Sequence, residues 1–202
     1  MTEQTIFLLS PANLSGERAK MVLNPRAGFG VAQALHSAQG ASLGDVFSFV
    51  SGLYFRGKVV YSAAFARPPE GDAGALVISA GEGLIPLAER IGADRLRRWA
   101  EVEISERNVA FTEPLIRDAE ALERAYGATT RFVLLGSVAS NKYVRPLTHV
   151  LGDHLLFPTE FVGRGDMSRG ALMLRAARAG TELAYEPVET AIRRGRRAPK
   201  LG

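Results

Sequence analysis

Three short apolar runs in this chain each end at a serine, and a loop of small or polar residues follows each of them. They span Thr5–Ser10, Ala75–Ser79 and Arg131–Ser137. Continuous apolar runs without polar alternation are typical of strands buried on both faces, as in a parallel sheet covered by helices. The carboxyl ends of parallel strands meet at one edge, and open α/β sheets bind their ligands there. The sequence therefore predicts the place of the functional site, although it names no reaction.

The other segments complete an α/β pattern in a chain of 202 residues, which is long enough for one domain with a full hydrophobic core. His154–Phe157 is expected to form a fourth strand, and Leu183–Tyr185 a short edge strand. Helices are expected after Ser15 and over Val31–Gln39, Leu43–Ala66, Ala93–Trp99, Ser105–Tyr126, Tyr143–Val150 and Ala171–Ala179. We therefore expect one three-layer α/β domain over residues 1–188, with a mainly parallel central sheet of about four strands flanked by helices.

Two of these helices contain residues that disfavour a continuous helix. Gly52 and Gly57 lie within Leu43–Ala66 and predict two helices with a bend. Pro114 is expected to divide Ser105–Tyr126, because proline removes a backbone donor and clashes with the preceding turn.

Positive charge gathers at the C-terminal end of the chain. The net charge is +4 overall, whereas the residues from Arg164 onward carry nine Lys or Arg and four Asp or Glu, a net of +5. Residues 189–202 include Arg193-Arg194-Gly195-Arg196-Arg197 and are expected to form a disordered basic tail with nothing to pack against. The alternative is that this run attracts a polyanion through phosphate contacts.

The residue types and motifs that are absent exclude several kinds of chemistry. The chain has no cysteine, which excludes disulfides, thiolate catalysis and cysteine metal sites. Its three histidines lack H-x-x-x-H spacing, and neither a G-x-S-x-G elbow nor a P-loop motif occurs. A serine hydrolase needs a serine, a histidine and an acid within reach, so a serine hydrolase, a zinc site and a P-loop are all disfavoured, and we expect no metal and no cofactor.

The sequence also favours a protein without a membrane partner. No apolar run approaches the roughly 20 residues that span a bilayer. The N-terminus lacks the basic start and apolar stretch of a signal peptide, so we expect a cytoplasmic location. The sequence leaves the oligomeric state open.

The loops after the first two strands carry polar candidates for the site. In the first loop, Ser10 and Asn13 precede a helix start that can hold a phosphate or carboxylate, and Arg18 can add a bidentate contact. The second loop holds a carboxylate between two glycines, which can act as a base or accept a sugar hydroxyl. Its candidates are Ser79, Gly81, Glu82 and Gly83. An ordinary capped turn is the structural alternative for both loops.

The loops after the third and fourth strands are richer in hydrogen-bonding groups. The third places hydroxyl, amide, ammonium and phenol groups together, in Ser137, Asn141, Lys142 and Tyr143. The fourth places two arginines and an acid among glycines, in Arg164, Asp166, Ser168 and Arg169. The functional interpretation is a mobile loop in which the arginines bind phosphate and Asp166 orients them. Helix capping, with Asp166 paired to an arginine, is the alternative.

Short motifs occur in order at Leu8–Ala12, at Val77–Ala80 with Gly83-Leu84, and at Leu134–Gly136 with Tyr143. Together they resemble segments of the YaaA-like family and of related small domains of unknown function. Leu8–Ala12 is similar to the strand and Ile-Ser-Pro-Ala motif with which those proteins open. Val77–Ala80 with Gly83-Leu84 is similar to their Leu-Ser-Ala…Gly-Leu segment. Leu134–Gly136 with Tyr143 resembles their late strand, glycine and tyrosine.

The resemblance implies oxidative-stress protection and DNA binding, and a fold similar to the base-processing domains of tRNA-modifying enzymes and uracil-DNA glycosylases. The family's usual lysine after Ser-Pro-Ala is Asn13 here. Phe157-Pro158 followed by Ser168-Arg169-Gly170 is similar in kind to the loop that glycosylases insert into DNA. The chain departs from those enzymes because no histidine follows this strand.

The main hypothesis is a protein that acts on nucleotides or nucleic acid through an anion-binding cleft at the carboxyl edge of the sheet, with base or N-glycosidic bond chemistry. Glu82 or Asp166 would act as acid or base, or would activate water. Two alternatives remain. One is a non-catalytic DNA-binding stress-response protein that uses the basic C-terminal fifth, and the other is an enzyme on a small anionic metabolite.

Overall fold

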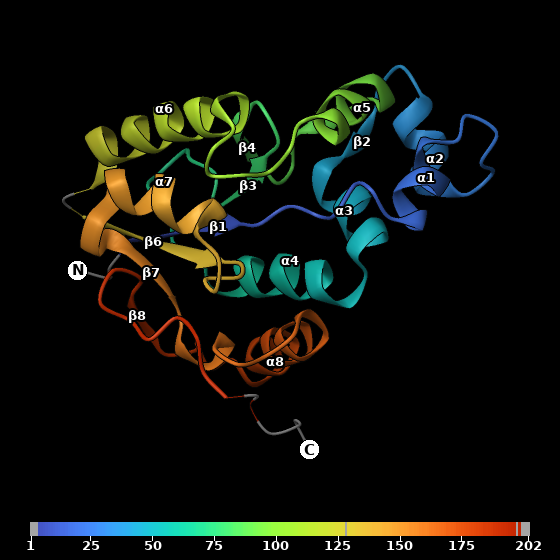
Figure 1. Cartoon of the computed structure of the whole chain (residues 1–202). Helices are drawn as coiled ribbons and strands as arrows, with labels where there is room; N and C mark the ends of the chain where they lie inside the picture. The colour runs from blue at the N-terminus through green and yellow to red at the C-terminus, as the bar shows by residue number, and fades with distance from the viewer. Residues whose placement is uncertain (1–3, 128, 197, 199–202) are drawn as a thin grey trace.

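A computed structural model describes residues 4–127, 129–196 and 198, and its centre is a six-stranded sheet in the order β4-β3-β1-β6-β7-β8 (Figure 1). The four inner strands β3, β1, β6 and β7 are parallel, whereas β4 and β8 run antiparallel at the two edges. The strands are β1 Gln4–Leu9, β3 Ala75–Ser79, β4 Gly83–Pro86, β6 Thr130–Leu135, β7 Leu155–Pro158 and β8 Tyr185–Pro187. A separate pair joins β2 Ala41–Ser42 to β5 Arg90–Ile91.

The parallel centre agrees with the α/β fold predicted from the apolar runs, but the sheet has more strands than the four expected. The fifth strand, β4, arises because Ser79 and Gly83 close a tight hairpin, with Gly81 and Gly83 at φ 97° and 82°. Positive φ of this kind is accessible to glycine and strained for other residues. The sixth strand, β8, pairs with β7 and lies two residues later than the edge strand we expected.

Helices cover both faces of this sheet and form the outer layers (Figure 1). They are α1 Glu17–Leu23, α2 Gly30–His36, α3 Leu43–Ser51, α4 Leu53–Phe65, α5 Ala93–Glu101, α6 Val109–Tyr126, α7 Asn141–Leu151 and α8 Asp166–Ala179, with short 3₁₀ turns at Gly152–His154 and Thr159–Phe161. Phe7 and Leu9 of β1 point into the core that contains α4 and α8. Ile6 and Leu8 point into the opposite core, beneath α6 and α7. Alternation along a strand thus supplies both cores with apolar side chains.

The predicted helix break at the glycines is confirmed in part, whereas the break predicted at Pro114 is wrong. Gly52 separates α3 from α4 at φ 61°, whereas Gly57 lies inside α4 without interrupting it. Pro114 lies inside α6, which continues through it to Tyr126. The capping residue before α6 is Asn108, whose side chain accepts a hydrogen bond from the amide of Ala110, and not Ser105 as expected.

The order of the parallel strands creates a crevice between β1 and β6. After β1 the chain passes into α1–α4 on one side of the sheet, and after β6 it passes into α7 on the other. Neighbouring strands whose following loops turn to opposite faces form the switch point at which open α/β sheets bind ligands. The fold therefore favours the loops after β1 and β6 over the loop after β3.

The basic C-terminal segment makes contacts that the sequence analysis did not expect. Arg193 donates a hydrogen bond to Asn141 Oδ1, and Arg194 donates one to the Ala139 carbonyl. The acceptors lie in the loop before α7 and at the first residue of this helix, where exposed oxygens attract guanidinium groups. The expectation that this segment packs against nothing is therefore wrong for these two arginines, whereas Arg197 and Lys200 lie outside the described residues.

Two glycines allow α4 and α8 to approach each other closely beneath the sheet. A Cβ at Gly57 would lie 2.8 Å from the carbonyl oxygen of Gly170, and a Cβ at Gly170 would lie 2.8 Å from the backbone of Leu53 and Tyr54. Both distances are shorter than van der Waals contact, so only glycine fits at either position. This contact fixes the position of α4 relative to α8.

We expect Gly57→Ala to lower the free energy of unfolding by about 1–3 kcal/mol, because the added methyl group meets backbone atoms that cannot rotate away. Gly30→Ala is the matched control, since Gly30 begins α2 and a Cβ there meets nothing within 4 Å. Urea denaturation compares the two variants with the parent chain. Equal stability of all three proteins would contradict the close helix contact.

Candidate functional site

A pocket of about 560 Å³ lies at the carboxyl ends of β1 and β6, at the switch point of the sheet. Its lining comes from the loops after β1, β3 and β6, from α3, α4 and the start of α7, from the end of α5 with the residues that follow it, and from the start of α8. Six of the residues predicted for the site line it: Ser10, Asn13, Ser137, Lys142, Tyr143 and Asp166. Stretches that are far apart in the sequence therefore meet at one polar pocket.

One wall of the pocket is apolar and aromatic. It includes Phe47 of α3 and Trp99 of α5, whose rings contact each other edge to face with centroids 6.4 Å apart, together with Val102 and Ile104. Trp99 is almost fully buried, and its indole Nε1 has no hydrogen-bond partner among the described residues. An apolar wall beside a few polar groups is the usual composition of a small-molecule site.

Lys58 of α4 lies under the floor of the pocket and is fully buried. Its Nζ donates hydrogen bonds to the Ser10 carbonyl oxygen and to Ser10 Oγ, both at 2.7 Å. The ammonium also lies 4.1 Å from the centroid of the Tyr54 ring and 5.2 Å from that of Phe55. No salt bridge found among the described residues includes Lys58. This lysine therefore links α4 to the end of β1 without a carboxylate partner.

Burial lowers the pKa of Lys58 to about 7, because the apolar surroundings disfavour the charged form. The charge of Asp166 opposes this change, whereas the charges of Arg169 and Lys142 reinforce it. Near neutral pH the amine is therefore present in both its charged and its neutral forms.

Tyr54 carries a second buried polar group at the pocket. Its hydroxyl has no hydrogen-bond partner among the described residues, although Arg169 and Ser10 lie near enough to influence its ionisation. Burial raises the pKa of Tyr54 to about 12, an effect that Arg169 partly opposes. The hydroxyl stays protonated at neutral pH and can donate to a ligand in the pocket.

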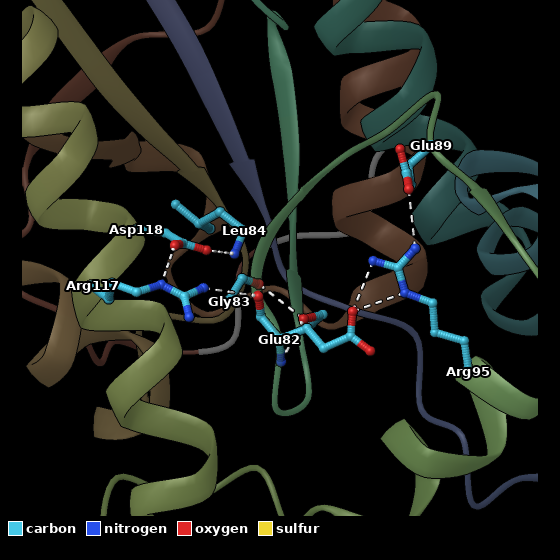
Figure 2. Close-up of polar contacts among 8 residues, drawn as sticks. Glu82, Gly83, Leu84, Glu89, Arg95, Arg117 and Asp118 are labelled. Atoms are coloured by element: carbon cyan, nitrogen blue, oxygen red, sulfur yellow. Dashed lines mark hydrogen bonds and ion pairs between the residues drawn. The ribbon is translucent and has the colours of Figure 1, made fainter.

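The loop after β3 is a hairpin held by its own contacts and by two neighbouring helices, as Figure 2 shows. The buried Ser79 hydroxyl donates to the Gly83 carbonyl at 3.0 Å and accepts from the Glu82 amide at 3.1 Å. The Leu84 amide donates to Asp118 of α6 at 2.9 Å. Ser79, Gly81 and Gly83 therefore shape the hairpin and are not part of the pocket lining.

Glu82, at the tip of this hairpin, is engaged by Arg95 of α5, which also reaches Glu89 (Figure 2). Arg95 Nη2 lies 2.8 Å from Glu82 Oε2. Burial acts to raise the pKa of Glu82, but hydrogen bonding and charge from Arg95, with Trp99 and Arg98 nearby, outweigh it and keep the pKa below its usual value. A carboxylate held in this way is a poor proton donor, and it does not line the pocket.

The loop after β7 contributes one side chain to the pocket and uses the others to build its own structure. Arg164 donates to the Glu160 carbonyl and to Ser168 Oγ. Arg169 is buried, donates to the Phe161 carbonyl and lies 3.5 Å from the carboxylate of Asp166. Asp166, the first residue of α8, is largely exposed and is the acid that this loop presents to the pocket.

Two further candidates lie at the margins of the site. Arg18 is exposed on α1 and donates to the Phe49 carbonyl at 3.4 Å. The side chain of Asn141 accepts from Arg193 at the start of α7. Neither residue lines the pocket.

Sequence reasoning missed Lys58, although a signal for it exists. Tyr54, Lys58, Tyr61 and Phe65 are all buried and follow helical spacing, so the lysine interrupts an apolar stripe. A charged residue at a core position of a helix needs a polar partner, and such positions are often functional.

Neither a metal cluster nor a membrane span is evident in the described part of the chain. No group of three or more His, Asp or Glu side chains there can hold a metal ion. None of its helices is long and apolar enough to cross a bilayer. Comparisons of the chain with protein-family models, with curated proteins and with solved structures give no match.

The low pKa of Lys58 predicts how stability changes with pH. Between about pH 7 and 10 the unfolded chain binds a proton at Lys58 that the folded chain lacks. The resulting destabilisation is complete below about pH 7 and disappears as the pH rises toward 10. Each pKa unit corresponds to about 1.4 kcal/mol.

We therefore expect the free energy of unfolding of the parent chain to rise relative to that of Lys58→Met by a few kcal/mol, on the order of the pKa change, between pH 7 and pH 10. Urea denaturation at a series of pH values measures this difference, and the comparison cancels the titration of other groups. A difference that stays constant over this range would contradict the low pKa.

Proposed function

We propose that this protein binds and acts on nucleotides in the pocket between β1 and β6. The observation that carries the proposal is the meeting of a cationic end at Lys142 and an aromatic wall in one pocket of about 560 Å³. A nucleotide has these two parts, an anionic phosphate and a planar base.

The cationic end is built around the start of α7. Lys142 lines the pocket in the first turn of this helix, where backbone amides also favour anions. The contacts of Arg193 and Arg194 add two positive charges beside the same loop. We infer that a phosphate binds here, with Ser137 as a further hydrogen-bonding group.

The opposite wall suits a planar ring. Phe47, Trp99 and the Tyr54 ring supply aromatic surface, and the buried Tyr54 hydroxyl supplies a donor. Burying an aromatic ring against such a wall is favourable, and unpaired buried donors gain a partner when a polar ligand binds.

The sequence resemblance to the YaaA-like family and to uracil-DNA glycosylase-like folds supports this proposal. Some residues that carry the resemblance line the pocket: Ser10, Pro11, Ala12, Ala80 and Tyr143. Two acids were candidates for chemistry at an N-glycosidic bond. Only Asp166 lines the pocket, whereas Glu82 is paired with Arg95 outside it, so this chemistry rests on Asp166 alone.

Nucleotide binding can be measured directly, because Trp99 is the single tryptophan of the chain and lines the pocket. We expect nucleoside monophosphates to change its fluorescence in a saturable way. Lys142→Ala is expected to weaken binding about 10- to 100-fold, the range for losing a charge-assisted hydrogen bond. Lys20→Ala is the control, since Lys20 is exposed and paired with Glu17 on α1. Equal affinity in both variants, or no response to any nucleotide, would contradict the proposal.

The alternative is a non-catalytic DNA-binding protein, which the net charge of +5 from Arg164 onward favours. We expect the chain without residues 190–202 to retain saturable mononucleotide binding, weakened by the loss of Arg193 and Arg194, and to lose the salt-dependent part of its binding to duplex DNA. Fluorescence titration over a range of salt concentrations measures both. DNA binding by a chain that binds no mononucleotide would overturn the proposed function in favour of this alternative.

A further inference from the structure

Ser10 holds the most unusual polar contact of the pocket. It lies at the end of β1, lines the pocket and accepts a hydrogen bond at 2.7 Å from the fully buried Lys58. We propose that Ser10 is a nucleophile, that Lys58 is the base which removes its proton, and that the substrate carries an acyl group joined to an anionic, nucleotide-like leaving half. The inference deepens the proposed function, and it rests on that function for the identity of the leaving half.

The hydrogen bonds around Ser10 fit both protonation states of the lysine. As an ammonium, Lys58 donates to the Ser10 carbonyl and to Ser10 Oγ, and its third proton lies toward the Tyr54 ring. The Ser10 hydroxyl then donates to the Leu135 carbonyl at 3.4 Å. As a neutral amine, Lys58 has a lone pair that can accept the Ser10 proton, while it still donates to the Ser10 carbonyl. The serine therefore has an acceptor in either state.

The surroundings of Lys58 favour the neutral amine that a base requires. The charged and titratable groups that act on it are Asp166 and Arg169 on α8 and Lys142 on α7, with the Tyr54 phenol on its own helix. Two of the three charges are positive, and burial brings the pKa to about 7. A desolvated lysine near a second cation is a known way to obtain an amine base at neutral pH, and serine–lysine pairs are an established variant of the catalytic triad.

A third group is placed to stabilise negative charge on the substrate. Tyr54 lines the pocket, and its buried hydroxyl lies near Ser10 and Arg169 without a well-formed hydrogen bond to any described residue. Its raised pKa keeps the proton available for donation. We assign Tyr54 as a donor to the oxyanion that forms when a carbonyl carbon is attacked.

The reaction proceeds in two balanced steps. Ser10 Oγ forms a bond to the acyl carbon as its proton moves to Lys58, and the bond to the leaving half breaks, so that the anion departs with the bonding pair. After Lys58 loses this proton to solvent, a water attacks the ester and gives one proton to Lys58. Lys58 returns that proton to Ser10 Oγ as the carboxylic acid is released.

A fluorophosphonate probe tests the nucleophile without knowledge of the substrate. Serine attack on phosphorus displaces fluoride and leaves a stable adduct, which mass spectrometry of the digested protein assigns to a residue. We expect the adduct on Ser10, no adduct there in Ser10→Ala, and unchanged labelling in Ser37→Ala, since Ser37 is an exposed helix-end residue. The rate is expected to rise with pH through about 7 and then level off.

Lys58→Met tests the base, and we expect labelling at least about 100-fold slower, with the rise near pH 7 lost. Tyr54→Phe leaves the ring in place and is expected to label about 10- to 100-fold more slowly. Circular dichroism confirms that each variant is folded. If Lys58→Met does not fold, the pH dependence of the labelling rate of the parent chain decides whether Lys58 is the base.

The failure of this inference is distinguishable from the failure of the proposed function. No adduct on Ser10 in a protein that still binds nucleotides overturns the inference and leaves the proposed function standing. An adduct that forms equally fast in folded Lys58→Met, or without a rise near pH 7 in the parent chain, overturns the role of the lysine.

Discussion

The contact between Lys58 and Ser10 is the interaction on which the rest of the site depends. It joins the first strand of the sheet to α4, and it does so at the switch point where the pocket lies. A buried amine in an apolar helix face is unfavourable by itself, and two hydrogen bonds to one serine are its compensation. The close approach of α4 to α8 at Gly57 and Gly170 holds the helix in the position that this contact requires.

The pocket follows from the strand order. Because the chain leaves β1 and β6 toward opposite faces, the loops after these two strands separate and leave a crevice between them. The β3 loop, by contrast, folds back as a hairpin, and α6 and Arg95 hold it. At this edge the β3 loop is mainly structural and contributes only Ala80 to the pocket, whereas the loops after β1 and β6 and the start of α8 supply its polar side chains.

The sequence alone predicted the parallel strands and the sheet edge at which the pocket lies, because apolar runs that end in Ser10, Ser79 and Ser137 indicate strands buried on both faces. It also predicted Ser10, Ser137, Lys142 and Asp166 as neighbours in the pocket. It did not separate these residues from Ser79 and Glu82, since a glycine-rich loop after a strand has the same pattern whether it binds a ligand or closes a hairpin. Only the pairing of β4 with β3 distinguishes the two cases.

Lys58 illustrates a different limit of sequence reasoning. The three histidines have no spacing that suits the base of a nucleophilic serine. The lysine lies 48 positions from Ser10 in the chain, so no local motif connects them, and their contact results from the packing of α4 on the sheet. Its place within a buried aromatic stripe is the one sequence signal of its role.

The ionisation of Lys58 tests the central claim most directly. The chain has four lysines, Lys20, Lys58, Lys142 and Lys200, so NMR of protein labelled with ¹³C at lysine Cε gives few signals, and the spectrum of Lys58→Met assigns the one of interest. The account predicts that the Lys58 signal titrates near pH 7. A signal that stays in its charged form to above about pH 10, as a lysine in water does, would contradict the account.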